Sequence, residues 1–171
     1  VFHSARWRHD HDLTGKRVAV IGTGASAIQI VPSIAEKVAR LDVYQRTAPW
    51  VVPRQDRAYT RLEKLAFRHV PGVQRLYRTG VYWGRECLVP GFVLQPALAK
   101  PLEKAALANI RRGLRAKPEL RERVRPDFAI GCKRILNSND WYPALDRDNV
   151  DLVTDGIAKI TPNAVVTADG T

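Results

Sequence analysis

Between residues 18 and 27 the chain reads Val18-Ala19-Val20-Ile21-Gly22-Thr23-Gly24-Ala25-Ser26-Ala27. The first four residues form a short apolar run with β-branched members, which is typical of a strand buried on both faces of a parallel sheet. Apolar side chains then recur at helical spacing from residue 25 to residue 39, with Pro32 expected to kink the helix. The stretch therefore predicts a strand, a glycine turn and a helix in immediate succession.

The turn between this strand and this helix has the G-x-G-x-x-A spacing of a dinucleotide-binding fingerprint. Gly22 permits a tight turn, Gly24 lets the backbone approach a pyrophosphate, and Ala27 allows close packing of the helix on the strand. Backbone amides and the positive end of the helix dipole favour the phosphate charges. The candidate cofactor-binding residues are Gly22, Thr23, Gly24, Ala25, Ser26, Ala27 and Gln29. The alternative is a glycine turn with a purely structural role.

The end of the next strand, residues 41–46, indicates which dinucleotide binds. NAD-binding folds place an Asp or Glu about 20 residues after the turn, where it accepts hydrogen bonds from the free ribose 2′-hydroxyl. This sequence has Arg46 there, whose guanidinium suits a 2′-phosphate, followed by the Thr47 hydroxyl as a second donor. NADPH is therefore favoured over NADH. Asp42 competes by spacing, but it lies at the strand's start, away from the phosphate side.

The rest of the chain predicts an α/β fold: a Rossmann-like parallel sheet with a helical insertion and a C-terminal β-hairpin. Residues 16–53 and 126–171 carry the Rossmann-like elements, including an alternating strand at Val150–Val153. Residues 54–125 are helical in pieces between prolines, which indicates the insertion. Residues 137–148 are polar and rich in turn signals, and residues 157–160 pair with 165–167 as the hairpin.

The composition is that of a globular protein, since 45% of the 171 residues are hydrophobic and 26% are charged. No apolar run reaches the roughly 18 residues of a membrane span and no signal segment is visible, so we expect a cytoplasmic protein without a transmembrane segment. Cys87 and Cys132 form no CxxC motif and no histidine has a partner at metal-ligand spacing, so no metal site is expected. The absence of Met and the start at Val1 indicate a fragment.

The formal net charge of +11 is concentrated in the insertion. Residues 54–125 hold 17 Lys or Arg and 6 Asp or Glu, whereas the rest of the chain holds 11 of each. These basic residues recur at helical spacing beside apolar ones, which indicates solvated helix faces or a face that packs on an acidic region outside the fragment. No aromatic RNA-binding pattern or zinc-finger spacing accompanies them, so nucleic acid is not an expected partner.

Five ordered blocks of sequence together resemble the class B flavoprotein monooxygenases. The blocks are His3-Ser4-Ala5-Arg6-Trp7, Leu13-Thr14-Gly15-Lys16-Arg17, residues 22–29, Gln45-Arg46-Thr47-Ala48-Pro49-Trp50 and Gly131-Cys132-Lys133-Arg134. The nearest resemblance is to the Baeyer–Villiger type, including 4-hydroxyacetophenone monooxygenase-like proteins, and it covers nearly the whole chain. It implies a central NADPH-domain fragment in which residues 1–15 link to a missing FAD domain.

The resemblance also implies roles for individual residues. Lys133 joins Arg46 and Thr47 around the 2′-phosphate, and Arg134 is the catalytic residue that reaches the flavin and stabilises the C4a-peroxyflavin. The implied enzyme uses NADPH, O2 and an FAD bound mainly by the remaining FAD domain of the same protein, and it oxygenates a small-molecule ketone or heteroatom. The fragment alone is expected to be inactive. His3 is implied to belong to a linker that couples domain movement to catalysis; a capping or packed surface histidine is the alternative.

Other interpretations remain open at this point. Arg8 stands where the Baeyer–Villiger fingerprint has Pro or Asp and is closer to N-hydroxylating variants, so the type of substrate is undecided. The chain also suits the NADPH-binding domain of another two-dinucleotide flavin reductase, although the CxxC of the disulfide-reductase type is missing. A third possibility is a basic helical interaction module without catalysis.

Overall fold

The computed structural model describes residues 1–54, 56–87, 89 and 96–170, so part of the expected insertion and residue 171 lie outside the described residues. The strands are β1 (Arg17–Ile21), β2 (Arg40–Tyr44), β3 (Val51–Val52), β4 (Leu136–Asn137), β5 (Val150–Val153), β6 (Ile157–Ile160) and β7 (Val165–Thr167). The helices are α1 (Ala27–Ile34), α2 (Arg61–His69), α3 (Val73–Glu86), α5 (Lys100–Gly113), α6 (Leu120–Arg123) and α7 (Trp141–Leu145), with short 3-10 turns η1 (Ser4–Arg6) and η2 (Pro96–Ala99).

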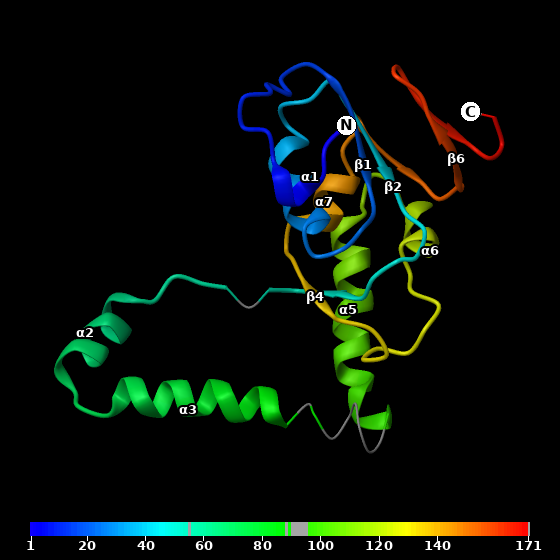
Figure 1. The fold of residues 1–171 in the computed structure, drawn as a ribbon. Coiled ribbons are helices and arrows are strands. Elements are labelled where there is room, and N and C mark those ends of the chain that lie inside the picture. Colours follow the sequence, from blue (N-terminus) through cyan, green and yellow to red (C-terminus); the bar gives the residue numbers. More distant parts are fainter. Residues whose placement is uncertain (55, 88, 90–95, 171) are drawn as a thin grey trace.

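A three-stranded parallel sheet in the order β1-β2-β5 forms the centre of the molecule. Ile21 lies opposite Tyr44, and Tyr44 lies opposite Val153, so the three strands end at the same edge of the sheet (Figure 1). The strands β6 and β7 pair antiparallel as the expected hairpin. The α/β class with a parallel sheet and a C-terminal hairpin is therefore confirmed.

The first helix is shorter than its sequence pattern. Apolar periodicity predicted a helix over residues 25–39, but α1 spans Ala27–Ile34 with Pro32 inside it. The segment after α1 makes hydrogen bonds to the residues before β1 instead of continuing the helix. The Lys37 carbonyl accepts from the Gly15 amide at 2.8 Å, and the Ala39 amide donates to the Lys16 carbonyl at 2.9 Å. These bonds turn the chain toward β2, and apolar spacing alone did not reveal them.

The expectation of a polar turn region at residues 137–148 was wrong. The residues Leu136–Asn137 form β4, which pairs parallel with β3, and Trp141–Leu145 forms α7. The Ser138 hydroxyl accepts from the amides of Asp140 and Trp141 at 3.2 and 3.1 Å. The polar residues thus organise the start of a short buried helix rather than a solvated loop.

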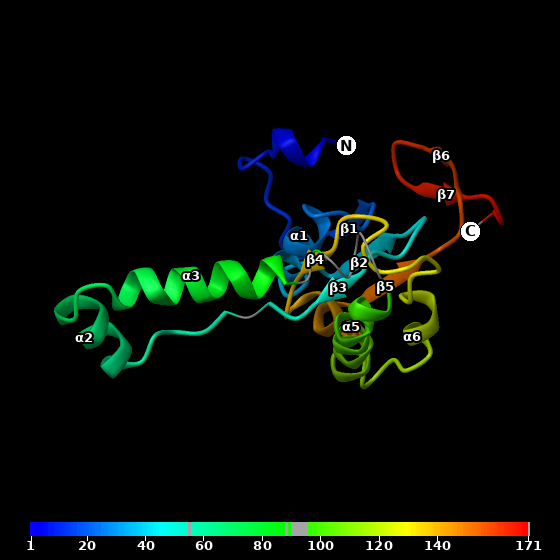
Figure 2. The same ribbon diagram turned by 90° about the horizontal axis from the view of Figure 1, so that it is seen from below.

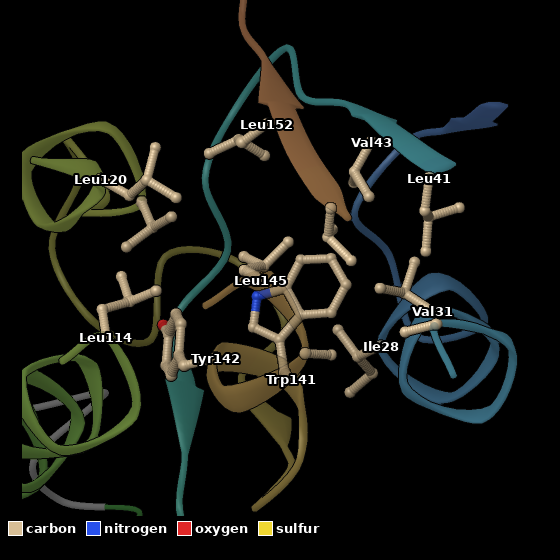
Figure 3. Close-up of a cluster of buried hydrophobic side chains, with 14 of the residues drawn as sticks. Ile28, Val31, Leu41, Val43, Leu114, Leu120, Trp141, Tyr142, Leu145 and Leu152 are labelled. Atoms are coloured by element: carbon tan, nitrogen blue, oxygen red, sulfur yellow. The ribbon is translucent and has the colours of Figure 1, made fainter. Parts of the chain in front are cut away.

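The main core lies between the sheet and the helices α1, α5, α6 and α7. Trp141 is 1% exposed and packs amid side chains from both the strands and the helices (Figure 3). Leu114 and Leu120 also belong to this cluster, so the second half of the insertion is part of the core. Tyr142 is 2% exposed, and burial raises the pKa of its hydroxyl above the range of an ordinary tyrosine.

The helices α2 and α3 project away from this core (Figures 1 and 2). Neither helix contains a buried residue. α2 begins with a capping box, in which the Thr60 hydroxyl accepts from the Glu63 amide and the Glu63 carboxylate accepts from the Thr60 amide. The two helices meet through a cluster of the rings of Tyr59, Phe67 and Tyr77.

A stability prediction arises where α5 ends against α7. A Cβ added at Gly113 would overlap the Tyr142 Cβ, and it would lie 3.1 Å from the Pro143 Cδ. Both atoms are held close to the backbone, so Gly113→Ala is expected to lower the free energy of unfolding by about 2–3 kcal/mol. Urea denaturation measures this change. The matched control is Gly80→Ala in α3, where a Cβ meets no atom within 4 Å. An equal loss in both variants would contradict the packing described here.

Candidate cofactor site

The turn after β1 needs glycine at its first position. Gly22 has φ +102°, a conformation that side-chain-bearing residues rarely adopt. Its amide donates to the Tyr44 carbonyl at 2.9 Å, which ties the turn to the end of β2. The backbone conformation of the turn therefore accounts for a glycine at position 22.

The backbone conformation does not account for a glycine at position 24. Its φ is not positive, and a Cβ built on it would meet no atom of the chain within 4 Å. Gly24, Ala25 and Ser26 are all exposed, so the mouth of the turn is open. A glycine whose side-chain position is empty fits a ligand that lies directly on the backbone, as the pyrophosphate of a dinucleotide does. The residues present thus fit the cofactor that the fingerprint indicates.

The amides at the start of α1 are available to an anion. In the described chain, the amides of Ala25, Ser26 and Ala27 donate to no protein acceptor, as expected at a helix N-terminus. The Ser26 side chain makes no capping bond. The Gln29 side chain donates from Nε2 to the Ala25 carbonyl at 3.1 Å and so steadies the turn from within. The amides and the helix dipole together favour negative charge at this place.

The loop after β2 lies beside the turn. Thr23 is buried, and its hydroxyl donates to the Thr47 carbonyl at 3.2 Å. The Arg46 and Thr47 side chains are exposed at this edge of the sheet. Asp42 lies further back, opposite Ala19, and its carboxylate accepts from Arg40 Nε at 2.9 Å. Arg46 and Thr47 are thus the polar side chains that the loop offers next to the turn.

The segment with Lys133 and Arg134 approaches from the same side. β3 and β4 are parallel, and the Leu136 amide donates to the Trp50 carbonyl at 2.9 Å. The residues just before β4 and the residues just before β3 therefore enter this pair at the same end. Lys133 and Arg134 are both exposed, and the Lys133 Nζ lies 4.4 Å from the centre of the Phe128 ring.

These basic side chains carry unpaired charge in the part of the chain that the structure describes. Within the described ranges, Arg46, Lys133 and Arg134 form no ion pair. Three unpaired positive charges on the two segments that lead into β3 and β4 create a field that attracts anions to this edge. A phosphorylated ligand therefore fits this region by charge as well as by the shape of the turn.

Three further features involve residues that are not assigned to the cofactor. The His3 Nδ1 accepts from the Ala5 amide at 3.1 Å, which is a capping contact. A cavity of about 1040 Å³ lies between the N-terminal residues, the sheet and the hairpin, and residues 22–27 do not line it. Cys87 and Cys132 are exposed free thiols.

The described residues contain neither a candidate metal site nor a helix that could span a membrane. Among the residues that the structure describes, no three His, Cys, Asp or Glu side chains gather where they would hold a metal ion. In the same residues, no helix has the length and apolar character needed to cross a bilayer.

The chain is similar to known monooxygenases in both sequence and structure, although no protein-family model matches it. It is 51% identical over 170 residues to a Baeyer-Villiger monooxygenase of Pseudomonas aeruginosa, covering 99% of this chain and 32% of the relative. A Baeyer-Villiger monooxygenase of Streptomyces coelicolor is 50% identical over 172 residues, covering 100% and 33%. The chain thus spans about a third of the length of these relatives.

Solved structures give the same result. An oxidised steroid monooxygenase bound to NADP superposes with a TM-score of 0.74 at 31% identity, covering 96% of this chain and 38% of that one. OTEMO in complex with FAD and NADP superposes with a TM-score of 0.77 at 27% identity, covering 99% and 40%. The resemblance to class B flavoprotein monooxygenases that the five sequence blocks indicated is confirmed.

Proposed function

We propose, on the premise that this chain is homologous over its whole length to a segment of Baeyer–Villiger monooxygenases, that it forms the NADPH-binding part of such an enzyme. In this proposal residues 1–15 link to an FAD domain, residues 16–53 and 126–171 form the Rossmann-like domain, and residues 54–125 are inserted into it. The open backbone at Gly24, next to the amides of Ala25, Ser26 and Ala27 that donate to no acceptor in the described chain, is the observation that carries the proposal.

Different residues of the site bind different parts of the cofactor. The amides of Ala25, Ser26 and Ala27 hold the pyrophosphate over Gly24, with Gly22 and Thr23 shaping the turn and Gln29 steadying it. Arg46, Thr47 and Lys133 bind the 2′-phosphate, which distinguishes NADPH from NADH. The relatives bound to NADP support this assignment, since they superpose on nearly the whole chain.

Arg134 has a different task in this proposal. When bound, NADPH supplies a hydride and FAD, held mainly by the rest of the protein, activates O2 for transfer to a small ketone or heteroatom substrate. Arg134 is exposed on the segment before β4, and its guanidinium forms no ion pair among the described residues. It therefore provides a fixed positive charge for negative charge that develops during oxygen transfer.

The cofactor assignment is tested by Arg46→Ala in the full-length enzyme. Loss of charge-assisted bonds to the 2′-phosphate is expected to raise the KM for NADPH about thirtyfold and to leave the KM for NADH within about twofold. Steady-state kinetics with both cofactors measure the change. The matched control is Arg61→Ala on the exposed helix α2, which is expected to affect neither cofactor. A similar rise in both KM values for Arg46→Ala would remove Arg46 from the 2′-phosphate site.

A further inference from the structure

We propose that Gln45, the residue before Arg46, is a positioning residue that fixes the cofactor-binding loop to the helical insertion. This inference rests on the function proposed above and adds a residue to it. Gln45 is 5% exposed, whereas Arg46 and Thr47, which follow it, are exposed. The buried amide therefore belongs to the residue immediately before the two side chains assigned to the 2′-phosphate.

The contacts of Gln45 join three parts of the chain. Its backbone amide donates to the Val153 carbonyl at 2.8 Å, which extends the pairing of β2 with β5 by one residue. Its Nε2 donates to the Arg123 carbonyl at 2.7 Å, at the last residue of α6. Because a carbonyl only accepts hydrogen bonds, the amide nitrogen must face Arg123 and the Oε1 must face away.

The Arg123 carbonyl that accepts this bond is held in place by the packing of α6. The side chains of Leu120 and Val124, on either side of Arg123 in sequence, are buried in the main core. Arg123 also donates from Nη2 to the Thr154 hydroxyl at 2.8 Å, just after β5. The carbonyl that Gln45 engages is thus held by the core and by a second link to the edge of the sheet.

The other end of the Gln45 amide adds no hydrogen bond within the described chain. Its Oε1 is buried and has no hydrogen-bond partner in the described chain. A buried acceptor without a partner opposes folding, whereas an unbranched apolar side chain of similar length would fill the space without that cost. In this proposal the Nε2 hydrogen bond instead holds the backbone from which Arg46 and Thr47 project.

This arrangement predicts a specific kind of defect. Without the Nε2 bond, the loop after β2 keeps its link to Thr23 but loses its link to α6. Arg46 and Thr47 then sample more orientations, and the 2′-phosphate loses the placement of its partners. Binding of NADPH weakens, while NADH, which lacks that phosphate, is little affected.

The experiment compares Gln45→Met and Gln45→Leu with wild type in the full-length enzyme. Methionine keeps the length of the side chain without the amide, and leucine removes the N–H donor with a shorter apolar side chain. Both variants are expected to raise the KM for NADPH about tenfold, the effect of one hydrogen bond, with kcat and the KM for NADH within about twofold. The melting temperature reports stability in parallel.

The matched control is Asn109→Leu. Asn109 is also a buried amide, 8% exposed, whose Nδ2 donates to the carbonyls of Val51 and Ser138 at 3.4 Å in the core beside β3. Its loss is expected to lower the melting temperature without changing the ratio of the two KM values. That ratio separates positioning of the loop from general destabilisation of the fold.

Two results overturn the inference. One is an unchanged ratio of KM values in both Gln45 variants; the other is a ratio that changes equally in Asn109→Leu. A wild-type enzyme that binds NADPH and NADH equally is a different outcome, because it removes the proposed function itself. The same set of measurements thus distinguishes failure of the positioning role from failure of the cofactor assignment.

Discussion

The Gly24→Val variant of the full-length enzyme is expected to lose measurable binding of NADPH, with the dissociation constant raised about a hundredfold or more. Valine would fill the open space above Gly24, where the proposal places the pyrophosphate. The φ of Gly24 is not positive, so the fold is expected to survive the change. A titration followed by protein fluorescence measures the dissociation constant, and circular dichroism checks the fold.

The control for this variant is Gly84→Val on the exposed helix α3, where an added Cβ also meets no atom within 4 Å. It makes the same change of side chain at a place where no ligand is proposed. Unchanged NADPH binding in Gly24→Val would mean that the backbone there lies away from any phosphate. The glycine turn would then be structural, as the alternative interpretation of the sequence has it.

The second large effect is expected from Arg134→Ala. Product formation should fall between about a hundredfold and a thousandfold, the loss seen when one group that stabilises a developing negative charge is removed. Reduction of the flavin by NADPH should remain within about threefold of wild type, since Arg134 is not assigned to the nicotinamide cofactor. Stopped-flow absorbance follows flavin reduction, and chromatography follows the oxygenated product.

Two further variants are compared with Arg134→Ala. Arg134→Lys keeps a positive charge of different shape and is expected to recover part of the product formation. Arg125→Ala removes another exposed arginine upstream of the same segment and is expected to behave as wild type. Normal turnover in Arg134→Ala would show that its charge takes no part in oxygen transfer.

Local signals in the sequence were sufficient for the centre of the fold. The apolar run before Gly22 and the alternation at Val150–Val153 predicted the strands β1 and β5. The expectation that the first of these strands is buried on both faces was wrong, because β1 lies at the edge of the described sheet and none of its residues is buried. The hairpin of β6 and β7 followed from two short runs joined by Thr161-Pro162-Asn163. Among these elements, the burial pattern of β5 matches the alternation of its sequence, with Val150 and Leu152 buried.

The region around β4 and α7 was not predictable in the same way. The helix α7 has five residues and begins after a polar stretch, so it is too short to show helical periodicity. Its stability comes from burying Trp141 and Leu145 against the sheet and α1, which a linear pattern does not report. The pairing of β3 with β4 joins residues far apart in sequence and left no local signal.

The sequence predicted only part of the candidate site. Glycine spacing and the position of Arg46 in the sequence were enough to propose a cofactor and its edge of the sheet. The sequence led to no functional prediction for Gln45, although its alternation with Leu41 and Val43 continues the buried face of β2 one residue past the end of the strand. Its partner, the Arg123 carbonyl, lies 78 residues away in sequence, so the bond became visible only in the structure.

The most direct test of the cofactor site is a crystal structure of the full-length enzyme with NADP+. We expect the pyrophosphate within hydrogen-bonding distance of the amides of Ala25, Ser26 and Ala27, and the 2′-phosphate against the Arg46 guanidinium. NADP+ bound elsewhere, with the mouth of the turn at Gly24 left to solvent or Arg46 directed away from the nucleotide, would contradict the account.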